Sequence, residues 1–380
     1  MHVLSRLFFY IFSSLRALLF FTRNNTLDNS VLIISNGMSM SGAPLVLLNV
    51  IEYYKSKGLT PIVLYEHDGL MRGKTGCNEY CCFFFEKIIQ KLCLQYNFKS
   101  IFINTIACNS WINFYENQNI EYNLWIHEGE EYFSKLAKSL PKKITSGKVF
   151  CVSEISKACL EKYVIQCSST LLNYPFDYKI NNRILNSDSE NKIVLLVGSI
   201  CRRKNQLELV EAIKIINERY KNEPIKFVFI GAPIEKEYGE QFSKEIKTIS
   251  NVEWISYMKH EDMMNFYKDA YVVVCTSTDD PLPVTITEAI FSLRLVLVSS
   301  GVGQYRTIKE NSCGYTYETH NIYELTEKIV DSLDLSDEQY KEIVKKAYIA
   351  FADKFSKKVF FKTLDEQLLI GNGSNHEISK

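Results

Sequence analysis

The sequence predicts an α/β protein with two Rossmann-like domains. Two series of short apolar runs, typical of buried parallel strands, alternate with segments of helical periodicity. The first series begins at Val31–Ile34 and the second at Ile193–Val197. A polar stretch rich in Asn and Ser, residues 176–191, separates them and is the predicted linker. The length of 380 residues is sufficient for two domains of ordinary size.

The composition excludes several classes of protein. Apolar residues make up 46% of the chain and charged residues 23%, which is typical of an ordered globular protein. The formal net charge is zero, which argues against a nucleic-acid coat protein or a broad basic membrane face. The 11 cysteines show no repeated pair spacing. We therefore expect reduced thiols in a cytosolic protein and no metal site.

The amino terminus is rich in Leu and Phe, but Arg6 and Arg16 interrupt the apolar run. No charge-free stretch reaches the roughly 20 residues of a membrane-spanning helix. On a helical wheel the apolar face consists of Leu4, Phe8, Ile11, Phe12, Leu15 and Leu18, and the polar face of Arg6, Ser13, Arg16 and Arg23. Two interpretations remain open, namely a helix over residues 3–23 that lies on a membrane surface, or a helix that packs on its own domain.

The first strand is followed by a Gly- and Ser-containing loop in which Gly42 and Ala43 precede Pro44. Such a loop lets the backbone approach a ligand closely, and Pro44 suits the start of a helix. A later predicted strand, Tyr122–Ile126, ends just before His127. A histidine at a strand end can donate to a phosphate or a sugar hydroxyl and can titrate near neutral pH. The alternative is a histidine with a purely structural role.

The remaining elements follow from the same patterns. Further strands are predicted at Pro61–Tyr65, Ser100–Ile106, Val149–Ser153, Lys226–Gly231, Tyr271–Cys275 and Leu295–Ser299, and a strand with its turn at Val252–Tyr257. Residues 66–86 are predicted to form a loop, and Ser153 to cap the helix that follows it. A last helical region is expected from Ser336 to about Leu369. One helix of the second domain places Leu209, Ala212, Ile213 and Ile216 on a common apolar face.

Three consecutive cations follow the first strand of the second domain. Arg202, Arg203 and Lys204 lie between Gly198 and a predicted helix. A diphosphate would neutralise them, with Arg as a bidentate donor and Lys as a point charge. The alternative is a solvated basic turn.

Two carboxylates flank a connection of seven residues after the strand Tyr271–Cys275. Asp280 lies in the loop, and Glu288 lies on the predicted helix. Polar loops at the carboxyl ends of parallel strands are where open α/β sheets bind ligands. The alternative is a loop carboxylate that caps the helix.

The prolines of this connection shape the start of the helix. Pro281 and Pro283 each fix φ, and Pro283 suits the first helical position. The amides of Val284 and Thr285 then remain available at the positive end of the helix, where a phosphate can bind.

The segment from Asp280 to Glu288 resembles the E-x7-E motif of the retaining GT-B glycosyltransferases, specifically the glycosyltransferase 4 group, with Asp280 where the family usually has Glu. The resemblance extends over residues 30–365 and is strongest from 192 to 315. In the family, the first carboxylate holds hydroxyls of the donor sugar and the second holds the ribose. A basic residue and a Lys hold the diphosphate. Lys204 matches that Lys, and either Arg202 or Arg203 could be the other cation.

The resemblance implies residue roles. The catalytic candidates are Asp280, Lys204, Arg203 and His127. The donor-binding candidates are Gly42, Ala43, Arg202, Lys204, Val284, Thr285 and Glu288. The nucleotide sugar is a substrate, and neither a cofactor nor a metal is implied.

The implied fold is GT-B, in which two Rossmann-like domains face each other across a cleft and a C-terminal helix crosses back. The corresponding division of the chain is an amphipathic segment at 1–25, an acceptor domain at 26–175, the linker at 176–191, a donor domain at 192–355, the crossing helix at 356–370 and a loose tail at 371–380.

The implied activity is transfer of a hexosyl unit from a nucleotide sugar to a glycan or lipid-linked glycan, with retention, in surface polysaccharide synthesis. We expect a cytoplasmic protein, with a membrane surface as a partner through residues 3–23 and no nucleic-acid partner. The alternatives are a catalytically weak GT-B protein that binds sugars or a partner, and a nucleotide-sugar epimerase. The donor base and sugar, the acceptor and its linkage, and the oligomeric state stay open.

Overall fold

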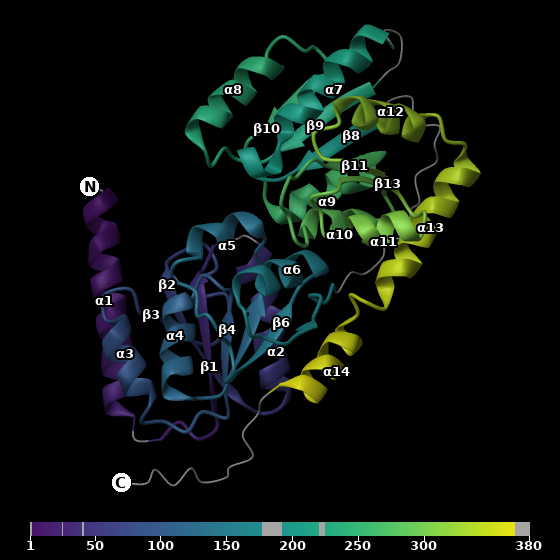
Figure 1. Cartoon of the computed structure of the whole chain (residues 1–380). Coiled ribbons are helices and arrows are strands. Elements are labelled where there is room, and N and C mark those ends of the chain that lie inside the picture. The colour runs from purple at the N-terminus through teal and green to yellow at the C-terminus, as the bar shows by residue number, and fades with distance from the viewer. Residues whose placement is uncertain (1, 25, 40–41, 177–191, 220–224, 369–380) are drawn as a thin grey trace. The chain divides into compact units, whose positions relative to one another are not determined.

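The chain folds into two compact units, each built on a parallel sheet (Figure 1). This computed structural model describes residues 2–24, 26–39, 42–176, 192–219 and 225–368. Unit 1 comprises Met1–Pro175 and Lys358–Lys380, and unit 2 comprises Phe176–Lys357. The predicted linker after residue 176 and the predicted tail lie outside the described residues.

Unit 1 contains a seven-stranded sheet in the order β3-β2-β1-β4-β5-β6-β7. Its strands are β1 (Ser30–Gly37), β2 (Thr60–His67), β3 (Asn78–Cys81), β4 (Ser100–Asn104), β5 (Tyr122–Ile126), β6 (Gly147–Cys151) and β7 (Ser169–Leu171). Its helices are α1 (His2–Arg23), α2 (Gly42–Ser56), α3 (Glu86–Cys93), α4 (Asn109–Gln118), α5 (Glu130–Leu136), α6 (Glu154–Tyr163) and α14 (Lys357–Gln367).

Unit 2 contains a six-stranded sheet in the order β10-β9-β8-β11-β12-β13. Its strands are β8 (Lys192–Val197), β9 (Ile225–Ile230), β10 (Val252–Ile255), β11 (Val272–Cys275), β12 (Leu295–Ser299) and β13 (Tyr315–Tyr317). Its helices are the short 3-10 helix η1 (Arg202–Lys204), α7 (Gln206–Arg219), α8 (Lys236–Ile246), α9 (His260–Asp269), α10 (Val284–Phe291), α11 (Tyr305–Glu310), α12 (Ile322–Leu333) and α13 (Asp337–Ala352).

Both sheets have a topological switch point. In unit 1 the chain adds β2 and β3 on one side of β1 and then continues with β4 on the other side. In unit 2 it adds β9 and β10 on one side of β8 and then continues with β11 on the other. Loops that leave neighbouring strands at such a point diverge, and the space between them is where α/β sheets bind ligands. The candidate site residues of unit 2 follow β8 and β11.

The central strands are apolar because both faces of each sheet are covered. In β11 all four residues are buried, and the predicted apolar face of α7 is confirmed, since Leu209, Ala212, Ile213 and Ile216 are all buried. Each large aliphatic side chain removed from water in this way stabilises the fold by about 1.5–3 kcal/mol.

Three predictions for the sheet of unit 1 are wrong. Strand β4 ends at Asn104 and not at Ile106, because Thr105 has a φ of 123° and cannot continue a strand. The segment predicted as a loop from residue 66 to 86 contains β3, which pairs with β2. The predicted strand Val149–Ser153 is β6 and ends two residues earlier, so that the Ser153 hydroxyl can accept a hydrogen bond from the amide of Ser156 (3.4 Å) as the N-cap of α6.

The last helical region consists of two helices, α13 and α14, and not of one. The capping box of Ser336 and Gln339 starts α13, which ends at Ala352. After this break α14 packs with unit 1, where Asp365 accepts a hydrogen bond from the Tyr53 hydroxyl (2.8 Å). The C-terminal helix thus returns to the first unit, as expected for a GT-B fold.

Helix α1 packs on its own unit, against β3 and α3 (Figure 1). Its inner side consists of Ser13, Ser14, Ala17 and Phe21, all of which are buried. The helical wheel placed Ser13 on the polar, solvent side, and this assignment is wrong because Ser13 accepts a hydrogen bond from the Cys81 amide (3.2 Å). In the part of the chain that the structure describes, no helix is sufficiently long and apolar to cross a membrane.

Phe21 and Phe8 provide a matched pair for testing how α1 is anchored. Phe21 is 1% exposed and belongs to the unit 1 core, whereas Phe8 is 69% exposed. We expect Phe21→Ala to lower the free energy of unfolding by about 3–5 kcal/mol, because it leaves a cavity. Phe8→Ala should change it by less than about 0.5 kcal/mol. Chemical denaturation measures both, and equal losses would show that α1 is not anchored through Phe21.

Candidate active site

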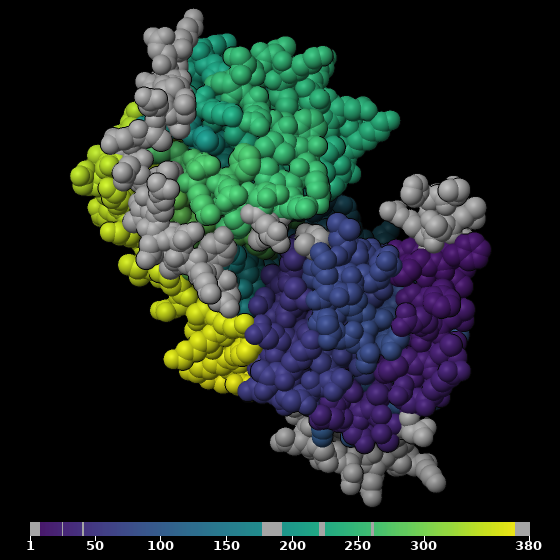
Figure 2. All heavy atoms as spheres, turned by 180° about the vertical axis from the view of Figure 1, so that it is seen from behind, coloured from purple at the N-terminus to yellow at the C-terminus, as the bar shows by residue number. Residues whose placement is uncertain are grey.

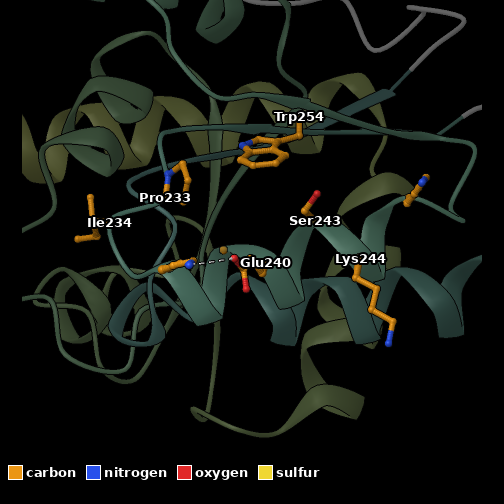
Figure 3. Close-up of a pocket in the computed structure, with 9 residues that line it drawn as sticks. Pro233, Ile234, Glu240, Ser243, Lys244 and Trp254 are labelled. Atoms are coloured by element: carbon orange, nitrogen blue, oxygen red, sulfur yellow. Dashed lines mark ion pairs between the residues drawn. The ribbon is translucent and has the colours of Figure 1, made fainter.

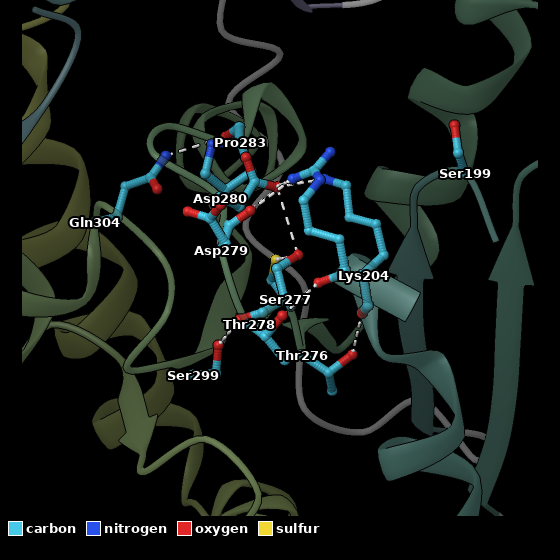
Figure 4. Close-up of polar contacts among 12 residues, drawn as sticks. Ser199, Lys204, Thr276, Ser277, Thr278, Asp279, Asp280, Pro283, Ser299 and Gln304 are labelled. Atoms are coloured by element: carbon cyan, nitrogen blue, oxygen red, sulfur yellow. Dashed lines mark hydrogen bonds and ion pairs between the residues drawn. The ribbon is translucent and has the colours of Figure 1, made fainter. Parts of the chain in front are cut away.

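An ion pair with little exposed surface joins the two loops at the switch point of unit 2 (Figure 4). Lys204, the last residue of η1, donates to Oδ2 of Asp280, which lies in the loop after β11. The Arg203 guanidinium lies 3.8 Å from the same oxygen. Only 11% of the Asp280 side chain and 16% of the Lys204 side chain are exposed. These three side chains together carry one net positive charge, which is an environment suited to an anion.

Backbone contacts hold the two loops together. The Thr278 amide donates to the Arg203 carbonyl (2.8 Å), and the Thr276 hydroxyl donates to the Lys204 carbonyl (2.8 Å). Asn205 ends η1 in the left-handed region, with a φ of 54°, so that the chain can enter α7. The position of Lys204 relative to Asp280 is therefore set by hydrogen bonds of the main chain as well as by charge.

The glycine turn after β12 holds the backbone of Asp280. The Asp280 amide donates to the Gly301 carbonyl (2.8 Å), and the Gly303 amide donates to the Asp280 carbonyl (2.9 Å). A Cβ on Gly301 would lie 2.4 Å from the Thr278 carbonyl oxygen, which is too close for any other residue. Glycine at 301 therefore allows the two loops to approach each other.

Of the two arginines that sequence left open, Arg203 lies beside Lys204 and Asp280. Arg203 also donates to the Asp279 carbonyl (2.7 Å). Arg202 is 67% exposed in its side chain and lies 3.7 Å and 3.8 Å from the carboxylates of Glu235 and Glu237. The two arginines therefore have different partners, Asp280 for Arg203 and the glutamates for Arg202.

Helix α10 begins one residue later than predicted. Pro283 has ψ of 122° and is the N-cap, so Val284 is the first helical residue. Gln304 donates from its side chain to the Pro283 carbonyl (3.0 Å) and holds this helix start. The amides of Val284 and Thr285, as the first two of the helix, have no carbonyl one turn earlier to bind.

Glu288 lies one turn into α10 and is almost completely buried. The Tyr267 hydroxyl of α9 donates to its carboxylate (2.8 Å). The sequence had shown no reason to single out Tyr267, because its partner comes from a separate helix 21 residues away.

In unit 1 hydrogen bonds link two of the predicted site residues, Ala43 and His127. Asn104, the last residue of β4, donates to the carbonyl of Ala43 (3.1 Å), and its oxygen lies 2.9 Å from Nε2 of His127. Gly42 opens α2 immediately before Ala43. The structure thus brings Ala43 and His127 to one side chain, Asn104, which the sequence analysis had not selected.

His127 does not titrate near neutral pH as the sequence suggested. Burial lowers its pKa to about 3, so the imidazole is neutral under physiological conditions. Its ring centroid lies 4.5 Å from that of Trp125. A neutral ring that contacts Asn104 can present one donor and one acceptor, but it is not a cation.

Glu128 fixes the strained turn beside His127. Its carboxylate accepts hydrogen bonds from the Thr105 hydroxyl, the His127 amide (3.0 Å) and the Ile106 amide (3.2 Å). Thr105 is a β-branched residue at a φ of 123°, a conformation that persists only when its surroundings enforce it. Burial raises the pKa of Glu128. Glu128 was not predicted, since a single Glu after His carries no motif.

A second carboxyl group lies at the ends of β1 and β2. The Asn36 side chain donates to Glu66 (3.0 Å), and burial, with the charge of Glu86 as a smaller cause, raises the pKa of Glu66 to about 7. Glu66 therefore exists in both protonation states near neutral pH.

A hollow on the surface of unit 2 contains none of the expected site residues. It has a volume of about 760 Å³ and lies between α8 and β10 (Figure 3). It is lined by Pro233, Ile234, Lys236, Gly239, Glu240, Ser243, Lys244, Lys247 and Trp254. Among the described residues, no group of three or more His, Cys, Asp or Glu side chains is arranged to hold a metal ion.

Comparisons with known proteins identify the fold. Residues 177–349 match the sequence pattern of the family described as glycosyl transferases group 1. No curated protein sequence matches the chain. The solved structures that are similar to it include HepE from Anabaena in complex with UDP and glucose, which has 14% identity and a TM-score of 0.72, with 89% of this chain and 98% of HepE covered.

Two further solved structures are similar to this chain over their whole length. A glycosyltransferase from Rickettsia africae has 18% identity and a TM-score of 0.70, with 92% of this chain and 100% of the other covered. WaaG, a glycosyltransferase involved in lipopolysaccharide biosynthesis, has 14% identity and a TM-score of 0.69, with 90% and 100% covered. The chain therefore has a GT-B fold, and its second unit carries the sequence pattern of group 1 glycosyl transferases.

The contact at Gly301 yields a prediction. Gly301→Ala should push the turn away from Thr278, displace Asp280 and lower the free energy of unfolding by about 1–3 kcal/mol. Gly37→Ala is the control, since a Cβ there meets nothing closer than 3.5 Å. Thermal denaturation of both variants measures the difference, and an unchanged Gly301→Ala protein would contradict the tight contact.

Glu66 predicts a pH dependence of stability. A carboxyl whose pKa rises from 4.5 to about 7 on folding stabilises the fold below pH 4.5, and this contribution is lost as the pH rises through 7. Glu66→Gln stays neutral, so relative to the parent it should gain on the order of 1–3 kcal/mol between pH 5 and pH 8. Urea denaturation at the two pH values measures this, and a pH-independent difference would refute the raised pKa.

Proposed function

We propose that this protein is a glycosyltransferase that moves a hexosyl unit from a nucleotide sugar to a glycan or lipid-linked glycan, with retention of configuration and without a metal ion. The observation that carries the proposal is the cluster of Lys204 and Arg203 around the buried Asp280 at the switch point of unit 2. The match of this unit to group 1 glycosyl transferases supports it.

In this proposal the cations hold the donor diphosphate. Lys204 and Arg203 are already oriented by Asp280 and by main-chain contacts, so little reorganisation is needed when the anion arrives. Charge that develops on the leaving diphosphate would be stabilised by these cations and by the first amides of α10, those of Val284 and Thr285.

The two carboxylates would hold the neutral parts of the donor. Asp280 would accept hydrogen bonds from hydroxyls of the sugar, and its proximity to Lys204 would put the sugar next to the diphosphate. Glu288, held by Tyr267, would accept from the ribose. In unit 1 we assign the backbone at Gly42 and Ala43 to the diphosphate, and the neutral His127 to a hydroxyl of the sugar.

We name no protein nucleophile. A phosphate oxygen of the donor would take the proton of the acceptor hydroxyl on the same face of the sugar, with retention as the result. Proton NMR of the first product determines the anomeric configuration, and an inverted product would overturn this part of the proposal.

The acceptor and the place of action are parts of the same proposal. WaaG acts in lipopolysaccharide biosynthesis, which supports a glycan or lipid-linked glycan acceptor in surface polysaccharide synthesis. We propose that transfer takes place in the cytoplasm, at the inner face of a membrane. HepE binds UDP and glucose, so UDP-sugars are the first donors to test, with GDP- and ADP-sugars beside them. Stabilisation against heat identifies the nucleotide that binds.

The alternative is a catalytically weak GT-B protein that binds sugars or a partner. Asp280 favours it, because this side chain is one methylene shorter than the Glu of the family and is already engaged by Lys204. Binding of a nucleotide sugar without transfer to any acceptor or to water would support this alternative.

Lys204 and Arg202 form a matched pair for the donor site. Lys204→Ala should lower sugar transfer about 100-fold or more, because a desolvated contact to the diphosphate is lost. Arg202→Ala should lower it less than about threefold, since this side chain is exposed and paired with Glu235 and Glu237. Steady-state rates with the donor found by heat stabilisation test both. Equal effects of the two substitutions would reject the assignment of Lys204.

Asp280 and Glu288 should separate sugar from nucleotide recognition. Asp280→Asn should lower transfer by tens to hundreds of fold, corresponding to about 2–3 kcal/mol for a lost charged hydrogen bond, with little change in affinity for the free nucleotide. Glu288→Gln should lower the affinity of the protein for the free nucleotide. Calorimetry with UDP and rates of transfer distinguish the two, and a parent rate in Asp280→Asn would remove Asp280 from the site.

A further inference from the structure

An apolar surface covers the outer side of α1. Phe8 is 69% and Phe12 is 66% exposed, and both lie opposite the buried side of the helix. The outer apolar surface, as we call it, consists of Phe8, Ile11, Phe12, Leu15 and Leu19 of α1 together with Phe83, Phe84 and Ile88 at the start of α3. Figure 2 shows α1, in purple, on the surface of the molecule.

The exposure of this surface is not a consequence of a loosely attached helix. On its inner side, the Tyr10 hydroxyl accepts a hydrogen bond from the Asp68 amide (3.1 Å), and the Ser14 hydroxyl accepts one from the Phe84 amide (3.4 Å). The Tyr96 hydroxyl donates to the Phe21 carbonyl near the other end of the helix. The large side chains thus point outward from a helix that is anchored between Tyr10 and Phe21.

Exposed aromatic residues before α3 lie beside α1, on its inner side. The ring of Phe83 lies 5.3 Å from that of Tyr10, and the Phe84 amide bonds to α1 through Ser14. Soluble monomers rarely expose so many large apolar side chains on neighbouring helices unless something covers them.

The charges of α1 beside the outer apolar surface are positive, and the half-buried Glu86 at the start of α3 accepts a hydrogen bond from the Ser110 hydroxyl. The sequence of α1 contains three Arg and no Asp or Glu. Arg16 follows Phe12 by four residues, and Arg23 follows Leu19 by four, so each cation lies one turn from the apolar stripe and is exposed. On α3 the exposed residues Lys87 and Lys91 flank Ile88. An occupant with an apolar interior and anionic groups at its border complements this pattern.

We propose that the outer apolar surface binds the surface of a bilayer that contains anionic lipids. The phenyl and leucyl side chains enter the boundary between headgroups and acyl chains, and the cations beside them contact the lipid phosphates. A second copy of this chain fits less well. A two-fold symmetric contact would place the same patch on both partners and so bring Arg16 and Arg23 towards cations of the other copy.

This inference goes beyond the proposed sugar transfer and does not depend on it. The membrane contact is made by a face of unit 1 that contains no donor-site candidate. Because α1 contributes Ala17 and Phe21 to the core, it acts as a fixed part of unit 1 and not as a removable anchor. Removal of residues 1–23 would therefore confuse loss of binding with loss of folding, and substitutions on the outer side are the suitable test.

The test is co-sedimentation of the full chain with vesicles. One set contains phosphatidylcholine alone, and the other contains phosphatidylcholine with phosphatidylglycerol. The double variant Phe8→Ser with Phe12→Ser should bind the anionic vesicles at least about tenfold more weakly than the parent. The double variant Tyr323→Ser with Ile349→Ser, in which two equally exposed side chains of unit 2 are changed, should bind like the parent. Thermal denaturation checks that all variants are folded.

Charge reversal tests the second part of the proposal. Arg16→Glu with Arg23→Glu should abolish the preference for anionic over neutral vesicles, and added salt should weaken binding of the parent. The proposal is overturned if the parent binds neither vesicle, or if the Phe8 and Phe12 substitutions leave binding unchanged. It is also overturned if light scattering shows a dimer that these substitutions dissociate, since the surface would then be an interface between copies.

Discussion

The ion pair between Lys204 and Asp280 is the interaction on which the arrangement of unit 2 depends. A carboxylate with little exposed surface is costly unless a cation and hydrogen bonds compensate it. Lys204, Arg203 and the Ser277 hydroxyl, at 3.4 Å, provide this compensation. Because Asp280 and Lys204 follow different strands, their pairing also ties the β8 loop to the β11 loop. The close approach of Gly301 completes the same assembly from β12.

Unit 1 uses a neutral counterpart of this arrangement. Its switch point is built around Asn104, which contacts the Ala43 carbonyl and His127, and the lowered pKa of His127 keeps the network uncharged. Glu128 stabilises the strained turn at Thr105 with three hydrogen bonds. One unit therefore presents charged side chains at its switch point, and the other presents oriented neutral dipoles.

Helix α1 shows which side of an amphipathic helix is used for packing on its own unit. From the sequence, membrane binding and packing on its own domain were alternative interpretations of this helix. In the structure small and hydroxyl-bearing side chains, Ser13, Ser14 and Ala17, fill the narrow contact with β3 and α3, and the large apolar side chains are left outside. Small residues permit close packing between elements, so the bulkier and more apolar side of a helix is not always the side that is buried.

The sequence by itself determined the features that depend on local order along the chain. Continuous apolar runs identified the central strands. The candidate site loops of unit 2 were identified from the basic cluster that ends in Lys204 and from the spacing of Asp280 and Glu288. The tertiary structure alone decided which partners meet. It brought Arg203 and not Arg202 to Asp280, paired Glu288 with Tyr267, and connected His127 to Asn104. It also lowered the pKa of His127 and placed Ser13 in the interior. These outcomes depend on strand order and on burial, which join residues that are far apart in the chain and which no local pattern encodes.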